Sequence, residues 1–280
     1  MCHVASLQLA GCQVVTCAFD KATYKPDWGK LEELISTRKP KLVVVTSPSN
    51  PSGAVWSLDE YQRIVDLCRQ SGAWLVFDQT YEEFLFDGAQ HIYPCGSKLG
   101  YRNIAHLFSF SKAYGMPGWR VGFTIAPTSL TDSFRKLQDT IPTCPTIISQ
   151  KLAERCLTVG NNNEKLPASS WVQSKVQSLS HIREAVWEAV APMGTIRTNG
   201  AFYFLVPVPA FLSEDEAVDI LAMQFKVLLM PGRAFGADNY MRLSYGSLDP
   251  TVSMAAVERL RLGCQYLLQL SETRKGDQNR

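Results

Sequence analysis

Lys112 is the residue whose surroundings most clearly suggest covalent chemistry. It follows Ser109 and Ser111 and precedes Arg120 in the segment SFSKAYGMPGWRVG. A lysine amine becomes a nucleophile, able to form a Schiff base with a carbonyl, when burial or a nearby cation disfavours its charged form. An arginine fork beside a serine hydroxyl suits a phosphate group. Pyridoxal 5'-phosphate carries both an aldehyde and a phosphate, so the segment is typical of a site for that cofactor. For a lysine considered alone, a solvated surface charge is the commoner explanation.

Asp78 and Tyr81 supply two further groups that such a cofactor needs. Asp78 follows the apolar run WLVF, and Tyr81 comes shortly after it. Pyridoxal phosphate withdraws electrons best when its ring nitrogen is protonated, and a buried carboxylate can hold that proton. The phenol of Tyr81 could bond the ring oxygen. The structural alternatives are a turn acid for Asp78 and a core tyrosine for Tyr81.

Asn50 lies in a third loop, SNPSG, which also follows an apolar run. Its amide could donate to the phenolate oxygen of the cofactor, although an asparagine in a turn needs no function. In an open parallel sheet, ligands collect at the carboxyl ends of the strands. Because Asn50, Asp78 and Lys112 all follow predicted buried strands, we expect them to converge at that edge.

The elements that must position these residues form two groups. We expect strands over residues 12–19, 42–46, 74–77, 104–108 and 121–126, and then over 203–206, 227–230 and 241–244. We expect helices over 28–36, 146–157, 171–190 and 251–270, and helices that begin at the capping boxes 57–60 and 213–216. The segment 160–170 should be a polar loop and 273–280 a frayed tail.

This order of elements predicts the fold class. The first group alternates strands with helices, which indicates an α/β layer with a mostly parallel, doubly wound sheet. The second group indicates a smaller α+β domain. We place the boundary between residues 1–158, the cofactor-binding domain, and residues 159–280, the C-terminal domain.

Composition excludes several other classes of protein. The net charge of +2 over 280 residues predicts no strong attraction to nucleic acid or membranes, and no long apolar run indicates a membrane span. The eight cysteines form no C-x-x-C pair, so we expect no metal site and a reducing compartment. No glycine-rich nucleotide-binding motif follows a predicted strand.

The three loops resemble the signatures of class I/II aminotransferases, the aspartate-aminotransferase-like group of pyridoxal-phosphate enzymes. The matching segments are SNPSG, DQTYEEFLFDG and SFSKAYGMPGWRVG, in that order. The resemblance continues through NGAFYFLV, MPGRAFG and NYMRLSYG, so it covers nearly the whole chain. Residues 137–153 are similar to a plant-type subgroup that uses aromatic amino acids or methionine as donors.

The resemblance implies a role for each residue. Lys112 would carry the Schiff base and move the substrate's α-proton, with Asp78 and Tyr81 as the other catalytic residues. Arg242 would bind the substrate's α-carboxylate, with help from Asn50. The cofactor-binding set would be Asn50, Asp78, Tyr81, Ser109, Ser111, Lys112 and Arg120.

The chain also departs from the family pattern. Members usually begin with a long N-terminal segment that supplies a glycine-rich phosphate cradle, an aromatic ring stacked on the cofactor, and a tyrosine lent across a dimer interface. That segment is absent here, so the resemblance implies an N-terminally truncated chain with an incomplete large domain. Ser47 also replaces the first asparagine of the family's motif.

The resemblance implies a transaminase that exchanges an amino group between an amino acid and a 2-oxo acid with ping-pong kinetics. It implies a homodimer, and we expect a cytoplasmic location because no targeting segment is visible. Two alternatives remain. One is a pyridoxal-phosphate lyase or an enzyme like aminocyclopropane-carboxylate synthase. The other is a truncated chain without activity that only binds a partner.

Overall fold

The computed structural model describes residues 2–94, 98–158, 169–246 and 249–278. Contacts divide the chain into two units. The four-stranded unit comprises Pro26–Ser49 and Val55–Gln177, and the three-stranded unit comprises Met1–Lys25, Asn50–Ala54 and Ser178–Arg280. The domain boundary expected after residue 158 stays a prediction, because it falls beside residues outside the described part.

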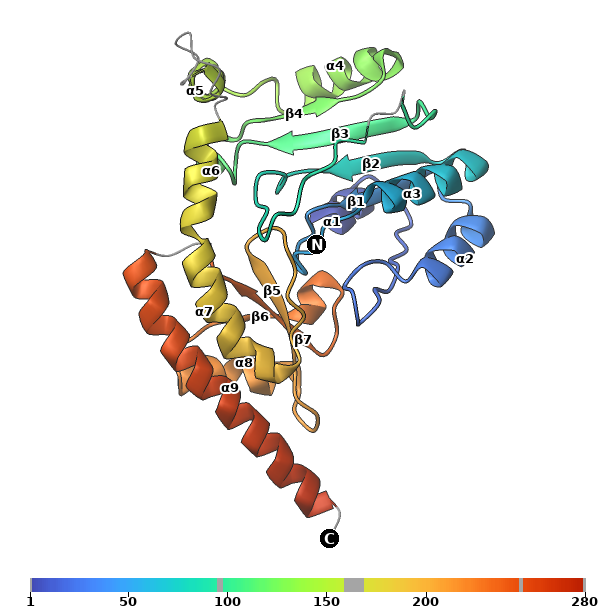
Figure 1. The fold of residues 1–280 in the computed structure, drawn as a ribbon. Helices are drawn as coiled ribbons and strands as arrows, with labels where there is room; N and C mark the ends of the chain where they lie inside the picture. Colours follow the sequence, from blue (N-terminus) through green and yellow to red (C-terminus); the bar gives the residue numbers. More distant parts are fainter. Residues whose placement is uncertain (1, 95–97, 159–168, 247–248, 279–280) are drawn as a thin grey trace. The chain divides into compact units, whose positions relative to one another are not determined.

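The four-stranded unit is built on a mixed sheet (Figure 1). Its strands β1 (Leu42–Thr46), β2 (Trp74–Asp78), β3 (Ile104–Ser109) and β4 (Gly122–Ile125) lie in that order. The first three are parallel, and β4 pairs antiparallel with β3. The predicted α/β class with a parallel-rich sheet is confirmed.

Helices of this unit begin and end largely where local signals place them. They are α2 (Trp28–Arg38), α3 (Leu58–Ser71), α4 (Thr131–Thr140), α5 (Ile147–Thr158) and α6 (Ser169–Ser178). The α3 helix starts at the predicted capping box and ends at Gly72, whose φ of 72° suits glycine. It packs against β2, and α2 packs against α3. The α4 helix was not expected from the sequence, since few of its residues are apolar and none is buried.

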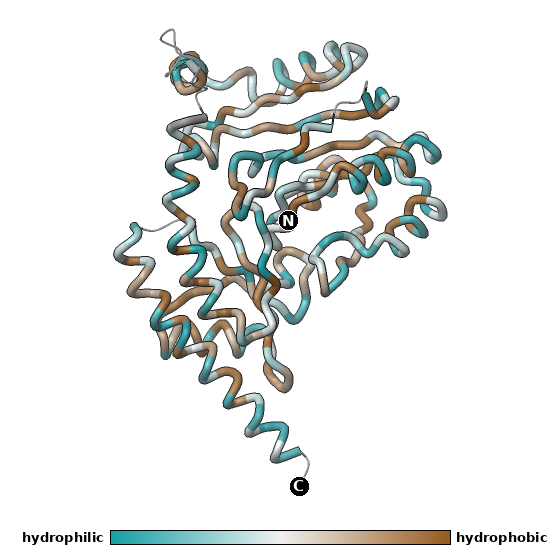
Figure 2. Tube along the Cα trace, in the orientation of Figure 1, coloured by the Kyte–Doolittle hydropathy of each residue, from teal (hydrophilic) through white to brown (hydrophobic). Residues whose placement is uncertain are grey.

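The three-stranded unit contains an antiparallel sheet in the order β5 (Tyr203–Pro207), β7 (Tyr240–Ser244) and β6 (Met230–Pro231). Its helices are α1 (Cys2–Leu9), α7 (Ser180–Val190), α8 (Glu214–Met223) and α9 (Pro250–Gln278). The α7 and α9 helices pack side by side (Figure 1). Figure 2 shows the last turns of α9 as mainly hydrophilic. None of the helices in the described part of the chain has both the length and the apolar composition of a membrane-spanning helix.

Three expected elements of this region were wrong. Residues 12–19 form no strand apart from a single bridge at Phe19, and most of their side chains are exposed. In the described part of the chain, no strand pairs with them along their length. The helix expected over 171–190 is two helices, separated at Leu179. Serines stand on both sides of that break, and serine hydroxyls compete for backbone hydrogen bonds. The strand expected over 227–230 is reduced to β6.

The expected tail is instead helical as far as Gln278. Two side chains tie this end of α9 to the segment before α8. Ser271 donates to the carbonyl of Ala210 at 2.7 Å, and Arg274 donates to the carbonyl of Phe211 at 2.9 Å. Arg274 also pairs with Glu216. These long-range contacts stabilise a polar helix end that local sequence does not favour. The expected loop 160–170 falls mostly outside the described residues.

The cysteines occupy contrasting environments. Cys68 and Cys264 are buried, and burial raises the pKa of each thiol to about 12. Cys12 and Cys144 are exposed. Cys68 and Cys264 therefore behave as the small core residues that the sequence suggested, and the half-buried Cys156 also packs against core residues.

Candidate functional site

Asp78 is the last residue of β2, at the carboxyl end of the parallel strands. It lies in register with Thr46 of β1 and Leu107 of β3. Its Oδ1 accepts hydrogen bonds from the backbone N–H of Thr80 at 3.0 Å and from the Thr80 hydroxyl at 2.6 Å. The carboxylate is half-buried and its orientation is fixed locally.

Ser109, Ser111 and Lys112 follow the neighbouring strand at the same end of the sheet. Ser109 closes β3, and its hydroxyl accepts a hydrogen bond from the backbone N–H of Ser111 at 3.1 Å. The Lys112 carbonyl accepts from Gly115 N–H at 3.1 Å, which closes the turn. The half-buried Lys112 amine has no hydrogen-bond or ion-pair partner among the described residues. Adjacent strands lie about 4.8 Å apart, so β2 and β3 bring the Asp78 and Lys112 segments close together at the carboxyl ends of the strands.

Arg120 is placed by the turn that connects β3 to β4. Its φ of 55° lies in the left-handed region, and Ser109 registers with Gly122 just beyond it. The exposed guanidinium donates to the carbonyl of Pro117 at 2.7 Å. The backbone of Arg120 therefore lies near Ser109, at the carboxyl ends of the parallel strands. Its side chain, however, donates to Pro117 within the same turn and not to Ser109.

Tyr81 is buried in the turn after β2. Its ring packs edge-to-face with Phe84, with ring centroids 6.4 Å apart. This burial agrees with the core role considered from the sequence. A bond from its phenol to a cofactor ring stays a prediction.

Arg242 and Asn50 form a contact within the three-stranded unit. Arg242 lies on the central strand β7, and its Nη1 donates to Asn50 Oδ1 at 3.0 Å. The guanidinium carbon is 4.6 Å from the centre of the Tyr203 ring and 4.1 Å from that of Phe235. Both distances are within cation–π range.

The Nε of Arg242 is buried and has no hydrogen-bond partner among the described residues. Buried donors are nearly always paired, so this nitrogen calls for an acceptor. The fork geometry of a guanidinium matches a carboxylate. The sequence identified Arg242 and Asn50 separately, and the structure brings them together. The rings of Tyr203 and Phe235 were missed, because nothing in the sequence pairs them with Arg242.

A buried polar chain beside Asp78 was also missed. Gln79 is 1% exposed, and its Oε1 and Nε2 lie 2.8 Å from His106 Nδ1 and 2.7 Å from His91 Nε2. Burial lowers the pKa of His91 to about 4, with the neighbouring His106 adding to the effect, and burial also lowers the pKa of His106. Both rings are therefore neutral at pH 7. Only the position of Gln79 next to Asp78 could have drawn attention to it.

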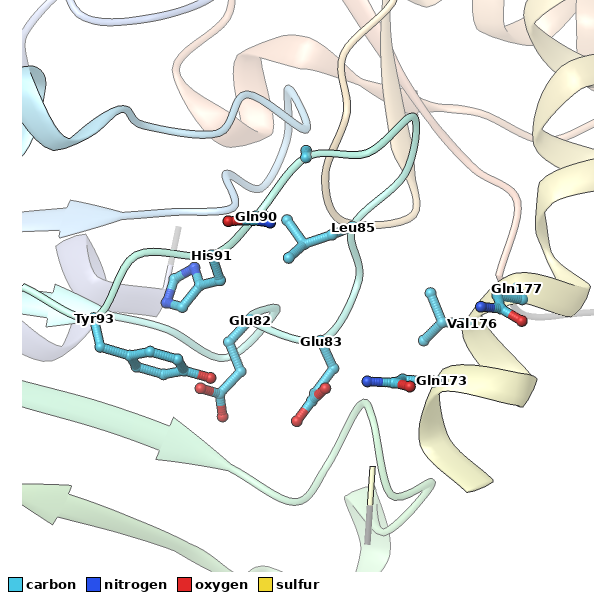
Figure 3. A pocket seen from close by; sticks show the side chains of 10 residues that line it. Glu82, Glu83, Leu85, Gln90, His91, Tyr93, Gln173, Val176 and Gln177 are labelled. Carbon is cyan, nitrogen blue, oxygen red and sulfur yellow. The ribbon is translucent and has the colours of Figure 1, made fainter. Parts of the chain in front are cut away.

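A cavity of about 440 Å³ lies within the four-stranded unit (Figure 3). Its polar lining includes Glu82, Glu83, His91, Tyr93, Gln173 and Gln177. Burial raises the pKa of Glu82 to about 7, partly offset by a hydrogen bond from Tyr93, and burial also raises the pKa of Glu83. No residue of the expected cofactor-binding set lines this cavity, so it is distinct from that set.

The expected residues thus fall into two sets, one in each unit. The four-stranded unit holds Asp78, Tyr81, Ser109, Ser111, Lys112 and Arg120. The three-stranded unit holds Asn50 and Arg242. The first set offers an amine, carboxylate, phenol, hydroxyls and guanidinium, and the second offers a guanidinium beside an amide.

The curated proteins most relevant to this chain are named as aminotransferases. Aromatic aminotransferase ISS1 of Arabidopsis thaliana is 39% identical over 256 residues, which cover 88% of this chain and 61% of that protein. Aspartate aminotransferase of Pyrococcus abyssi is 31% identical over 219 residues, covering 75% of this chain and 54% of that protein. The chain therefore spans less than two thirds of the length of these relatives.

Solved structures agree with the sequence relatives. A double mutant of Thermus thermophilus aspartate aminotransferase superimposes with a TM-score of 0.81 at 27% identity, covering 92% of this chain and 65% of that one. The aromatic aminotransferase of Pyrococcus horikoshii gives a TM-score of 0.77 at 26% identity, covering 90% of this chain and 65% of that one.

The family profile described as "Aminotransferase class I and II" matches residues 2–260, which is most of the chain. The strand-end loops that suggested this resemblance lie inside the match. The chain belongs to the class I and II aminotransferase family.

Proposed function

We propose that the protein is a pyridoxal-phosphate-dependent transaminase that moves an amino group between an amino acid and a 2-oxo acid. The observation that carries the proposal is the placement of the Asp78 and Lys112 segments at the carboxyl ends of adjacent strands. Membership of the aminotransferase family supports the same reaction.

The side chains of the four-stranded unit fit pyridoxal phosphate chemically. Lys112 offers an amine that has no hydrogen-bond or ion-pair partner in the described part of the chain. Asp78 offers a half-buried carboxylate, and the Ser109 hydroxyl suits a phosphate. The Arg120 guanidinium donates to the Pro117 carbonyl through Nη1, and its remaining N–H groups could donate to a phosphate. When bound, the cofactor supplies an aldehyde for condensation and an electron-withdrawing ring.

Each residue then has a defined task. The Lys112 amine would hold the cofactor's aldehyde carbon, and it would remove and return the proton at the substrate's α-carbon. Asp78 would keep the proton on the cofactor's ring nitrogen, and Thr80 holds the Asp78 carboxylate in place. Arg242 and Asn50 bind and orient the substrate's α-carboxylate.

For the donor substrate we propose an aromatic amino acid. The support is the 39% identity to a protein named as an aromatic aminotransferase, compared with 31% to one named as an aspartate aminotransferase. On family resemblance alone, we further propose that the protein acts as a homodimer in the cytoplasm.

The role of Lys112 can be tested with borohydride. The protein is incubated with pyridoxal phosphate, its absorbance spectrum recorded, and the mixture reduced and digested for mass spectrometry. We expect yellow protein and a reduced cofactor adduct on Lys112. We also expect Lys112→Ala to lose both the adduct and turnover with an aromatic amino acid and a 2-oxo acid.

Lys136→Arg, on the exposed α4 helix, is the matched control and should keep the adduct. An adduct at another lysine, or full turnover by Lys112→Ala, would refute the assignment. Release of ammonia without formation of a new amino acid would replace the transaminase by a lyase.

A further inference from the structure

Glu214 is a buried acidic residue of the three-stranded unit. It is the first residue of α8 and is only 8% exposed. Its Oε2 accepts from the backbone N–H of Arg233 at 3.1 Å, and its Oε1 accepts from the backbone N–H of Asn239 at 2.5 Å. A buried carboxylate is tolerated when such donors satisfy it. Its Oε2 also lies 3.6 Å from Arg233 Nη1, so one side chain binds the chain at Arg233 and at Asn239.

These two points bracket the loop that joins β6 to β7. The loop begins with a short 3-10 helix, Gly232–Phe235, and Ala237 N–H donates to the Gly232 carbonyl at 3.0 Å. The backbone packs so closely that a Cβ at Gly232 would come within 2.2 Å of the Ala237 carbonyl oxygen. Glu214 thus holds both ends of a compact loop that has little room to rearrange.

The loop carries Phe235, whose ring centre is 4.1 Å from the guanidinium carbon of Arg242. An arginine side chain has many rotamers, and ordering it costs free energy. Phe235 restricts that freedom on one side, and the bond to Asn50 restricts it further. A shift of the loop would move this ring and remove one of the three described contacts that hold the guanidinium, while Asn50 and the Tyr203 ring would stay in place.

We propose that Glu214 is a positioning residue for substrate binding, acting through the 232–239 loop and Phe235 to hold Arg242 ready for a substrate carboxylate. The inference rests on the proposed function, because it takes Arg242 as the carboxylate-binding group. Glu214 itself contacts neither substrate nor cofactor.

The adjacent acidic residue provides a matched control. Asp215 pairs with the Arg233 side chain at the surface, and its side chain is 67% exposed. Among the described residues, Asp215 contacts the Arg233 side chain and makes no hydrogen bond to the loop backbone. Asp215→Asn removes the same charge as Glu214→Gln, one residue away, while keeping the loop held at both ends.

The probe is 3-phenylpropanoate, a carboxylate that cannot be transaminated. Its Kd for the cofactor-loaded protein is measured by calorimetry, alongside that of the uncharged 3-phenylpropan-1-ol. In Glu214→Gln one oxygen remains, and the new amide N–H₂ faces a backbone N–H. We expect about tenfold weaker binding of the carboxylate, equivalent to about 1.4 kcal/mol, and little change for the alcohol or in Asp215→Asn.

A double-mutant cycle tests whether the effect passes through Arg242. If it does, Glu214→Gln will add nothing to the loss caused by Arg242→Leu. Additive losses, or equal weakening of the carboxylate and the alcohol, would show a general structural role and overturn the proposal. Hydrogen exchange should also show faster exchange at the Arg233 and Asn239 amides in Glu214→Gln.

Three further outcomes separate the inference from the proposed function. If Glu214→Gln fails to fold, Phe235→Leu tests the next link and should also weaken binding of the carboxylate; unchanged binding would overturn the proposal. If both Glu214→Gln and wild type bind 3-phenylpropanoate equally, the inference fails while the proposed function stands. Absence of a borohydride adduct on Lys112 would instead refute the proposed function, whatever the carboxylate data show.

Discussion

The orientation of the Gln79 amide determines which ring nitrogens of His91 and His106 carry a proton. Its carbonyl oxygen faces His106 and its nitrogen faces His91. His106 therefore donates its Nδ1–H, and His91 accepts at Nε2. Protonation of His91 would place two donors against each other, so the fold holds this ring neutral in addition to the effect of burial.

We predict an acid-sensitive contribution to stability from His91. Its pKa is about 4 in the folded protein and about 6.5 when unfolded, so between these values the unfolded chain binds more protons. This contribution is present above pH 6.5 and is lost as the pH falls towards 4. It amounts to about 3 kcal/mol.

Urea unfolding of wild type and His91→Phe at pH 7 and pH 4.5 measures this contribution. We expect wild type to lose more stability on acidification than the variant does, although the variant is less stable at pH 7. The comparison with the variant isolates the effect of His91. Glu82, whose pKa is raised to about 7, favours the folded state as the pH falls over the same range, and it does so in both proteins. Equal losses would rule out His91 as the source. His181→Phe, on the exposed face of α7, controls for removal of a surface histidine.

At the scale of residues, the sequence indicated the candidate functional residues that stand in short, recognisable motifs. Lys112 and Asp78 were identifiable because each follows an apolar strand in a polar loop. Glu214 and Phe235 were not, since their contacts depend on distances across the fold. The catalytic and binding roles of the expected residues stay predictions.

Helix caps show how local and distant contacts compete at the scale of an element. Ser57 and Glu60 form both hydrogen bonds of a capping box at α3. At α8, Ser213 accepts from Glu216 N–H, but the Glu216 side chain pairs with Arg274 of α9. The same sequence signal thus gives a local cap in one helix and a long-range anchor in the other.

We predict that Ser57→Ala lowers the free energy of unfolding by about 1 kcal/mol, because it leaves a backbone donor of α3 without its partner. Ser57→Asp should retain most of the stability, since aspartate is a good N-cap residue. Urea denaturation of the three proteins compares them. If the alanine and aspartate variants lose equal stability, the cap is not the cause.

Most elements could be predicted from sequence because their signals are local. The run LVVVT became β1 at its predicted bounds, and the stripe of α3 became a buried face. Residues 12–19 have the composition of a strand, yet strands need partners that composition does not reveal. The end of α9 has the composition of a tail, yet Arg274 and Ser271 anchor it.

At the scale of the molecule, the four-stranded sheet has an open edge. No strand of the described chain pairs with the outer side of β4, and Phe123 and Ile125 are 46% and 56% exposed there. An exposed apolar edge strand presents unpaired backbone groups to other molecules. Charged side chains are one means by which natural proteins discourage such pairing, and the four residues of β4 carry none.

We therefore predict concentration-dependent self-association that Ile125→Lys reduces, because an edge lysine disfavours intermolecular strand pairing. Light scattering over a concentration series is the measurement. Ile148→Lys is the control: it adds the same charge at a side chain that is 68% exposed on α5, away from any strand edge. If both variants reduce association equally, net charge rather than the β4 edge is responsible.

The contrast between buried and exposed cysteines has a practical consequence. Cys12 and Cys144 are exposed and lie in different units, whereas desolvation makes Cys68 and Cys264 poor nucleophiles. With the other cysteines changed to serine, maleimide dyes would attach to Cys12 and Cys144. Energy transfer between the two dyes would then follow, in real time, how the two units respond when an amino acid binds.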